Sequence, residues 1–240
     1  MDTTRTRGEF NVRARTCILW LCAAVLLIAA AMPETAWAEA ASEREYQLKA
    51  AFLYNFIMFI DSPRLAPPGE GAKQDVSEAE KPILIGIIGK DPFGAAFEPL
   101  KNKEVRDRSV AIKRFKGLET PVDTKAPAAE NLPDLDAIRK CHVLFVCASE
   151  RAHLRTILGP IKGQSVLTVS DVPGFLEAGG TIDFVIEEKK VRFEINTAAA
   201  ARAKLKIRSK LLRLATRVIK TDTFEGQSND GGNEAGSRDQ

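Results

Sequence analysis

The uncharged segment from Ala50 to Ile60 limits the fold of this chain more than any other feature. Helical side chains turn by about 100° per residue, so the apolar groups of a helix predicted over residues 44–60 point all round its axis. A single core-facing stripe cannot bury them, and the helix must be covered either between a sheet and another element or by a second chain, which would form a homodimer. Its aromatic residues are therefore candidate partner contacts: Phe52, Tyr54, Phe56 and Phe59.

Downstream, strand and helix patterns alternate. The continuous apolar run Ile83–Gly89 is typical of a strand buried on both faces, and a turn and a short helix over 93–100 follow it. Similar units are predicted as strands 142–147 and 165–170 with helices 149–161 and 172–178, Ser149 being the expected N-cap of the first helix. A less buried strand is expected at 109–115, and a Pro/Ala-rich connector at 121–133.

The C-terminal part predicts an antiparallel hairpin, with residues 181–186 pairing with 191–195 across the turn Glu187–Lys190. Asn196 is placed to cap a last helix. These patterns predict an α/β fold: a single compact domain with a mixed, mostly parallel sheet, flanked by helices and ending in a hairpin and a helix.

The N-terminus has the features of an export signal. Arginines precede the uncharged run Cys17–Met32, and Ala36-Trp37-Ala38 offers small residues where a signal peptidase reads them. We expect a cleavable signal peptide over 1–38 that directs the chain to the periplasm; an uncleaved anchor is the alternative. The α/β domain is expected over 39–222 and a disordered tail over 223–240.

Export would leave Cys141 and Cys147 in an oxidising compartment, where a disulfide is one expectation. The residues between them read as a buried strand, and a strand of that length spans about 20 Å, whereas a disulfide tolerates less than about 7 Å between Cα atoms. A bridge would therefore require the strand to bend or end early. Two buried free thiols are the alternative.

Catalytic and metal-binding patterns are missing from the sequence. His142 and His153 have no Cys, Asp or Glu at a metal-ligand spacing, and no hydrolase or phosphate-loop motif occurs. We therefore predict a protein that is not an enzyme and needs no cofactor. The 35 basic residues nearly balance 32 acidic ones, which gives no reason to expect nucleic-acid binding.

A small ligand would bind most naturally beyond the carboxyl ends of the parallel strands. The residues predicted to line this crevice are Gly89, Asp91, Ser149, Glu150, Ser170 and Asp171.

The segment Thr197–Lys220 carries eight basic residues and no acid, and it predicts a basic amphipathic helix. Its basic face could be solvated, could dock an acidic partner or could contact an anionic membrane surface. Lys204 and Arg208 fall in the apolar arc, which requires either an interruption near 204–208 or pairing with buried acids such as Asp183 or Glu194. Further candidate partner contacts are Arg192, Glu194, Arg213 and Arg217.

Several stretches together resemble the YfiR/HmsC-like family of periplasmic proteins. In chain order they are Tyr46–Phe56, Ile85–Gly94, Cys141–Phe145, Leu167–Asp171, Val191–Asn196 and Ser209–Leu212. The resemblance implies a compact, non-enzymatic α/β domain that regulates by contact. The best-known member inhibits YfiN, an inner-membrane diguanylate cyclase, by binding its periplasmic region, and an outer-membrane lipoprotein, YfiB, sequesters the inhibitor.

The resemblance thus implies a negative regulator in cyclic-di-GMP signalling that affects biofilm or exopolysaccharide output by protein–protein interaction. Its expected partners are a membrane diguanylate cyclase and a lipoprotein of the YfiB type. A periplasmic small-ligand-binding module that uses the strand-end crevice is the alternative function.

Overall fold

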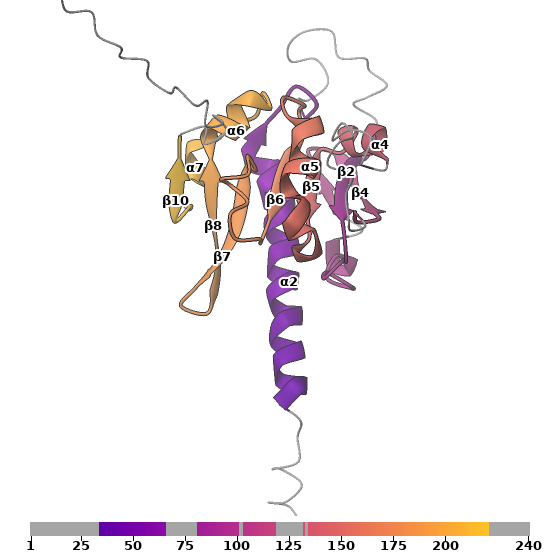
Figure 1. Cartoon of the computed structure of the whole chain (residues 1–240), viewed down its shortest axis with the longest axis vertical. Coiled ribbons are helices and arrows are strands. Elements are labelled where there is room, and N and C mark those ends of the chain that lie inside the picture. Colours follow the sequence, from indigo (N-terminus) through magenta and orange to yellow (C-terminus); the bar gives the residue numbers. More distant parts are fainter. Residues whose placement is uncertain (1–33, 66–80, 101–102, 119–131, 133, 221–240) are drawn as a thin grey trace, which may run out of the picture. The chain divides into compact units, whose positions relative to one another are not determined.

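Strands and short helices alternate along the chain in the computed structural model, which describes residues 34–65, 81–100, 103–118, 132 and 134–220 (Figure 1). The helices are α2 (Glu34–Phe59), α4 (Leu135–Arg139), α5 (Leu154–Leu158), α6 (Thr197–Arg202) and α7 (Ser209–Leu212), with 3₁₀ turns η1 (Glu98–Leu100), η2 (Ala148–His153) and η3 (Gly159–Ile161). The strands are β1 (Ile60–Asp61), β2 (Ile83–Ile88), β3 (Glu104–Val105), β4 (Arg108–Phe115), β5 (Val143–Val146), β6 (Leu167–Ser170), β7 (Ile182–Glu187), β8 (Lys190–Asn196), β9 (Lys206–Ile207) and β10 (Arg217–Ile219).

Contacts divide the chain into two compact units, residues 1–44 and 45–240, and the sheet with its two cores lies within the second. The predicted tail over 223–240 lies outside the described residues. So does the predicted signal peptide over 1–38, apart from the helical backbone of 34–38, and so does the predicted connector over 121–133, apart from Leu132.

Eight strands form the main sheet, in the order β10-β8-β7-β6-β5-β2-β4-β3. The central pairs are parallel, and Ile85 of β2 lies between Ile112 of β4 and Val143 of β5. Antiparallel pairing occurs between β7 and β8 and between β3 and β4. Glu188 and Lys189 adopt φ of 49° and 62° in the turn of the β7–β8 hairpin, as a two-residue type I′ turn requires. The predicted mixed, mostly parallel sheet with a C-terminal hairpin is therefore confirmed.

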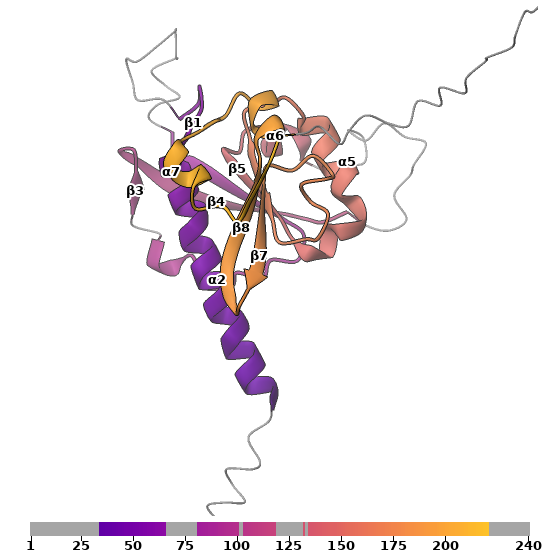
Figure 2. The same ribbon diagram turned by 90° about the vertical axis from the view of Figure 1, so that its left-hand side faces the viewer.

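Both faces of the central strands are buried, which explains their continuous apolar sequences. Within β5, Phe145 belongs to the core that contains α2, whereas Leu144 and Val146 belong to the core that contains α5. Figure 2 shows α2 and α5 on opposite sides of the sheet. The sheet thus separates two apolar cores, and a residue's position along each strand decides which core it joins.

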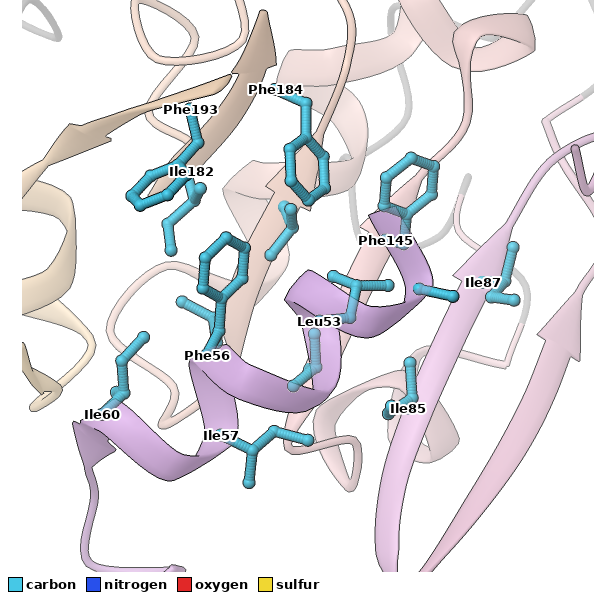
Figure 3. Packing of buried hydrophobic residues seen from close by; sticks show 14 of the residues in the cluster. Leu53, Phe56, Ile57, Ile60, Ile85, Ile87, Phe145, Ile182, Phe184 and Phe193 are labelled. Carbon is cyan, nitrogen blue, oxygen red and sulfur yellow. The ribbon is translucent and has the colours of Figure 1, made fainter. Parts of the chain in front are cut away.

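Helix α2 is covered on more than one side by its own chain. Figure 3 shows Phe56 pointing toward Phe184 and Phe193 of the hairpin, whose ring centroids lie 5.7 and 5.1 Å from its own. Elsewhere on the helix, the Lys210 ammonium of α7 lies 5.2 Å from the ring centroid of Phe59. Strand β1, which follows α2 directly, pairs with β9 as a separate two-stranded sheet. The sheet and the C-terminal segment therefore bury most of the apolar surface that the sequence places around this helix.

Cys141 and Cys147 flank β5, and the structure has both as free, buried thiols. Cys141 belongs to the core that contains α5, and Cys147 to the core that contains α2. The two thiols therefore lie in different cores; the paired residues of β5 are 143–146, so Cys141 precedes the strand and does not follow its alternation.

Two predicted helices on the α5 side differ in the structure. Residues 149–161 form three short pieces, η2, α5 and η3, and the N-cap position belongs to Cys147 instead of Ser149. Residues 172–178 form a series of turns in which Gly174 has a φ of 86°. The helix predicted over 93–100 is likewise a set of turns that ends in η1. Pro160 and Gly174 favour short turns over a continuous helix in the first two segments.

The predicted basic helix over 197–220 is wrong, because this segment folds as α6, β9, α7 and β10. Asn196 does cap α6, and its Oδ1 accepts the backbone N–H of Ala199 at 2.9 Å. Helix α6 ends at Arg202, and Lys204 then adopts a left-handed φ of 56°. The predicted interruption near 204–208 is confirmed, since the helix has ended before these residues and they contain β9.

The basic residues of this segment therefore do not form one stripe. Arg208 reaches Asp61 of β1, with an N–O distance of 2.8 Å, and does not pair with the acids that the sequence suggested. The hydrogen bonds from Arg208, helped by Arg106, hold the pKa of Asp61 below its usual value. Strand β10 pairs in parallel with β8, which places Arg217 opposite Glu194.

Candidate functional site

Three of the six predicted crevice residues pack against one another at the carboxyl ends of β2 and β5. Ser149 Oγ accepts the backbone N–H of Lys90 at 3.0 Å and donates to Glu150 Oε1 at 2.8 Å. Glu150 is 3% exposed, and its Oε2 accepts the backbone N–H of Leu118 at 2.9 Å. A Cβ on Gly89 would lie 2.7 Å from Glu150 Oε1, so the close approach of this carboxylate depends on the glycine. Gly89, Ser149 and Glu150 are therefore close neighbours, and Glu150 is held by backbone and side-chain hydrogen bonds of its own chain.

Two other crevice candidates bind the neighbouring backbone and side chains. Asp91 Oδ1 accepts the backbone N–H of Phe93 at 2.8 Å, and its Oδ2 forms an ion pair with Arg114 at 2.6 Å. Ser170 is fully buried and donates from Oγ to the carbonyl of Val146 at 2.7 Å. These contacts hold the strand ends in place.

Asp171, the sixth candidate, contacts helix α2. Its Oδ2 lies 2.6 Å from Lys49 Nζ and accepts the phenol hydroxyl of Tyr46 at 2.9 Å. Lys49 Nζ also lies 2.6 Å from Glu45 Oε1, one helical turn earlier. Burial, reinforced by the Asp171 carboxylate, raises the pKa of the Tyr46 phenol, so Tyr46 stays a hydrogen-bond donor. The cluster fixes the loop after β6 to the helix.

Asp183 lies beside this cluster, because β6 and β7 pair Ser170 with Asp183. Its side chain is almost fully buried, and the residue is 6% exposed. Burial, together with the nearby carboxylates of Glu194, Asp171 and Glu177, raises the pKa of the Asp183 carboxyl to about 8. Glu194 itself pairs with the Arg217 guanidinium, whose Nε lies 2.9 Å from Glu194 Oε2.

These groups line an open cavity of about 610 Å³ between α2, the loop after β6 and the β7–β8 hairpin, named here the hairpin cavity. Its polar lining residues are Glu45, Tyr46, Lys49, Asp171, Glu177, Asp183, Glu194 and Arg217. Phe184, Val185 and Ile186 of β7 add apolar groups to the lining. The cavity thus combines a carboxylate-rich surface with an apolar one, as small-molecule sites do.

The predicted aromatic contacts of α2 do not form an exposed patch. Phe56 is fully buried, so a partner cannot touch it while the domain stays folded. Phe52, Tyr54 and Phe59 are half-buried against the same core, and the Tyr54 hydroxyl donates to the backbone carbonyl of Glu104.

Of the charged partner candidates, Arg192 and Arg213 are exposed. Glu194 and Arg217 are paired with each other, and Arg217 also lies 3.4 Å from Glu177. The structure therefore brings Glu194 and Arg217 to the hairpin cavity and leaves Arg192 and Arg213 at the surface.

Four residues of the hairpin cavity, Glu45, Tyr46, Lys49 and Glu177, were not predicted as site residues, and Asp183 was expected only as a partner for a buried cation. A signal was present on α2, where Glu45 and Lys49 are one turn apart and Tyr46 lies on the same helical face as Lys49. Lys49 is also the last charge before the uncharged segment. The partner of Lys49, Asp171, lies 122 positions away in the sequence, and only the fold brings the two together.

Among the described residues, no helix is long and apolar enough to cross a membrane, and no three His, Cys, Asp or Glu side chains are grouped to hold a metal ion.

Comparison with known proteins gives one strong match. A model of the YfiR/HmsC-like family matches residues 46–216, which include every strand of the main sheet except β10. No curated protein matches. Among solved structures, a conserved domain protein from Vibrio cholerae O1 biovar El Tor is 10% identical with a TM-score of 0.42, over 57% of this chain and 54% of that one.

A second solved structure, an ABC domain in complex with L-Trp from Streptococcus pneumoniae, is 14% identical with a TM-score of 0.41, over 57% of this chain and 55% of that one. The chain thus spans about half the length of each structure, and likeness at this level carries no argument about function. The family match covers most of the chain and follows the fold from α2 to the C-terminal segment. This chain therefore belongs to the YfiR/HmsC-like family, a family of periplasmic, non-catalytic regulators.

Proposed function

We propose that this protein is an exported regulator that binds the periplasmic sensor region of an inner-membrane diguanylate cyclase and holds the cyclase in its inactive state. The observation that carries the proposal is the family match over residues 46–216. A binder that prefers the inactive state shifts the cyclase population toward it, and no chemistry by the binder is needed.

The state of the reactive side chains supports a binding role. Burial raises the pKa of the Cys141 thiol to about 11 and raises that of Cys147 as well, so neither is a thiolate nucleophile at neutral pH. His142 is buried, and its Nδ1 accepts the backbone N–H of Leu84 at 3.0 Å. These groups hold the fold together and are not presented to a substrate.

The surface proposed for the cyclase includes Arg213, which follows α7, and Arg192 on the solvent side of β8. Both side chains are exposed in the structure and carry the positive charge that an acidic partner would need. A lipoprotein of the YfiB type that competed for this surface would release the cyclase. A homodimer would compete in the same way if it used this face.

Deletion of the gene, followed by measurement of cellular cyclic-di-GMP, tests the direction of the effect. We expect a rise that the full chain reverses and that a chain lacking residues 1–38 does not, because the proposal requires export. Unchanged or lower cyclic-di-GMP after deletion contradicts inhibition.

The contact surface is tested by pull-down of the cyclase sensor region with the Arg213→Glu and Arg192→Glu variants. Arg151→Glu is the matched control, because Arg151 is exposed in η2, which directly precedes α5. Loss of capture with the first two variants and retention with the third are expected. Equal capture by all three would show that the proposed surface is wrong, even if inhibition itself holds.

A further inference from the structure

The hairpin cavity has more negative than positive charge in its lining. Five carboxyl side chains and two cations, Lys49 and Arg217, face it. Both cations already have partners: Lys49 binds Glu45 and Asp171, and Arg217 binds Glu194 and Glu177. The cavity therefore has acidic groups whose charge its own cations do not match.

Two carboxyl oxygens in this lining are buried and accept no hydrogen bond from the part of the chain that the structure describes. They are Asp171 Oδ1 and Asp183 Oδ1. Asp183 is 6% exposed, and the Asp171 side chain is 9% exposed. Because a buried acceptor without a donor is unfavourable, native proteins satisfy nearly all such atoms, and an unsatisfied pair that lines a cavity points to a donor supplied from outside.

The rest of the lining decides what kind of donor fits. Val185 and Ile186 of β7 also line the cavity and are at least partly exposed, and Tyr46 of α2 belongs to the same lining. Metal ions need several converging ligand atoms, and the described residues include no such group. A donor that carries positive charge and also has an apolar body satisfies both parts of the lining.

We propose that the hairpin cavity binds a small organic cation, with a primary ammonium or guanidinium group donating to Asp183 and Asp171 and an apolar body against the apolar side chains of β7. This site does not depend on the regulatory function proposed above.

Calorimetric titration of the purified full chain with phenethylamine hydrochloride at about pH 8 tests the proposal. We expect saturable binding of this ammonium, and binding at least about tenfold weaker for the neutral isostere 2-phenylethanol and for the anion 3-phenylpropionate, because a charge-assisted hydrogen bond contributes a factor of that order. Magnesium chloride is expected not to bind. No saturation up to about 10 mM, equal binding of the alcohol, or binding of magnesium in place of the amine would overturn the proposal.

Single substitutions distinguish a loss of ligand binding from a loss of folding. Asp183→Asn keeps the side-chain shape and is expected to weaken phenethylamine binding at least about tenfold, whereas Glu187→Gln, which alters an exposed carboxylate on the same strand, is expected to leave it unchanged. Asp171→Asn provides a second variant.

Affinity in the wild type should also rise between about pH 6 and 8, approaching tenfold per pH unit, because Asp183 must lose its proton to receive the cation. Asp183→Asn should abolish this dependence. A folded Asp183→Asn variant with wild-type affinity, or a wild-type affinity that does not change with pH, would refute the assignment.

Discussion

Replacing Asp183 with Asn should stabilise the protein at neutral pH, although it removes a side chain from the proposed ligand site. Burial is the main reason that the pKa of this carboxyl is raised to about 8, and Glu194, Asp171 and Glu177 reinforce it while Arg217 opposes it. The carboxyl has its ordinary value of 3.8 in the unfolded chain. Between these two values the folded protein binds more protons than the unfolded one, so the free energy of unfolding falls as pH rises.

The size of the effect follows from the displacement of the pKa. Each pKa unit corresponds to about 1.4 kcal/mol, so ionisation linkage at Asp183 lowers the free energy of unfolding at pH 7 by at most about 4 kcal/mol. Asparagine does not ionise and avoids this loss. Because the cavity is open to solvent, which lessens burial, we expect a gain of roughly 1–4 kcal/mol for Asp183→Asn at pH 7.

Urea unfolding of the wild type and of Asp183→Asn between about pH 5 and 9 measures this difference directly. The stability advantage of the variant should grow with pH and level off above the folded pKa of about 8, whereas Glu187→Gln should show no such trend. An advantage that stays constant across this range, or a variant that is less stable than the wild type at pH 8, would refute the linkage.

Three further predictions concern the fold. Gly89→Ala should lower the free energy of unfolding in urea by several kcal/mol, because Gly89 has a φ of 101° and an added Cβ would meet the side chains of Ser149 and Glu150. Gly94→Ala is the control: Gly94 has a φ of 49° but open space around it, so the loss should be smaller. Phe56→Ala should cost about 3–5 kcal/mol by the same assay, since this fully buried ring contacts the hairpin aromatics. Cys141 and Cys147 should resist iodoacetamide at pH 8 in the folded protein and react after denaturation, as mass spectrometry would show; rapid labelling of the native chain would contradict their burial.

Local sequence patterns were sufficient to predict structure where residues that are close in the sequence are also in contact in the fold. The β7–β8 hairpin joins adjacent segments, and in β8 the buried Phe193 alternates with the exposed Arg192. The continuous apolar run of β2 correctly indicated a strand covered on both faces. Asn196 could be recognised as a helix cap because its hydrogen bond reaches only three residues along the chain.

Helical periodicity gave a wrong prediction where strand pairing with distant parts of the chain determined the structure. Residues 197–220 have the spacing of an amphipathic helix, yet β8 offers an unpaired edge that Arg217–Ile219 joins, and β1 offers another that Lys206–Ile207 joins. Backbone hydrogen bonds to these strand edges replace the backbone hydrogen bonds that one long helix would have formed. The ion pairs of Arg208 and Arg217 add to them.

The sequence by itself determined the α/β class, the alternation of the central strands, the hairpin and the need to cover α2 on several sides. Each of these follows from side-chain periodicity over a few residues. The tertiary structure decided that Glu150 binds the backbone of Leu118 and that Lys49, Asp171 and Asp183 meet at the hairpin cavity. These groups come from separate segments of the chain, and their burial and charge balance exist only after the segments have packed together.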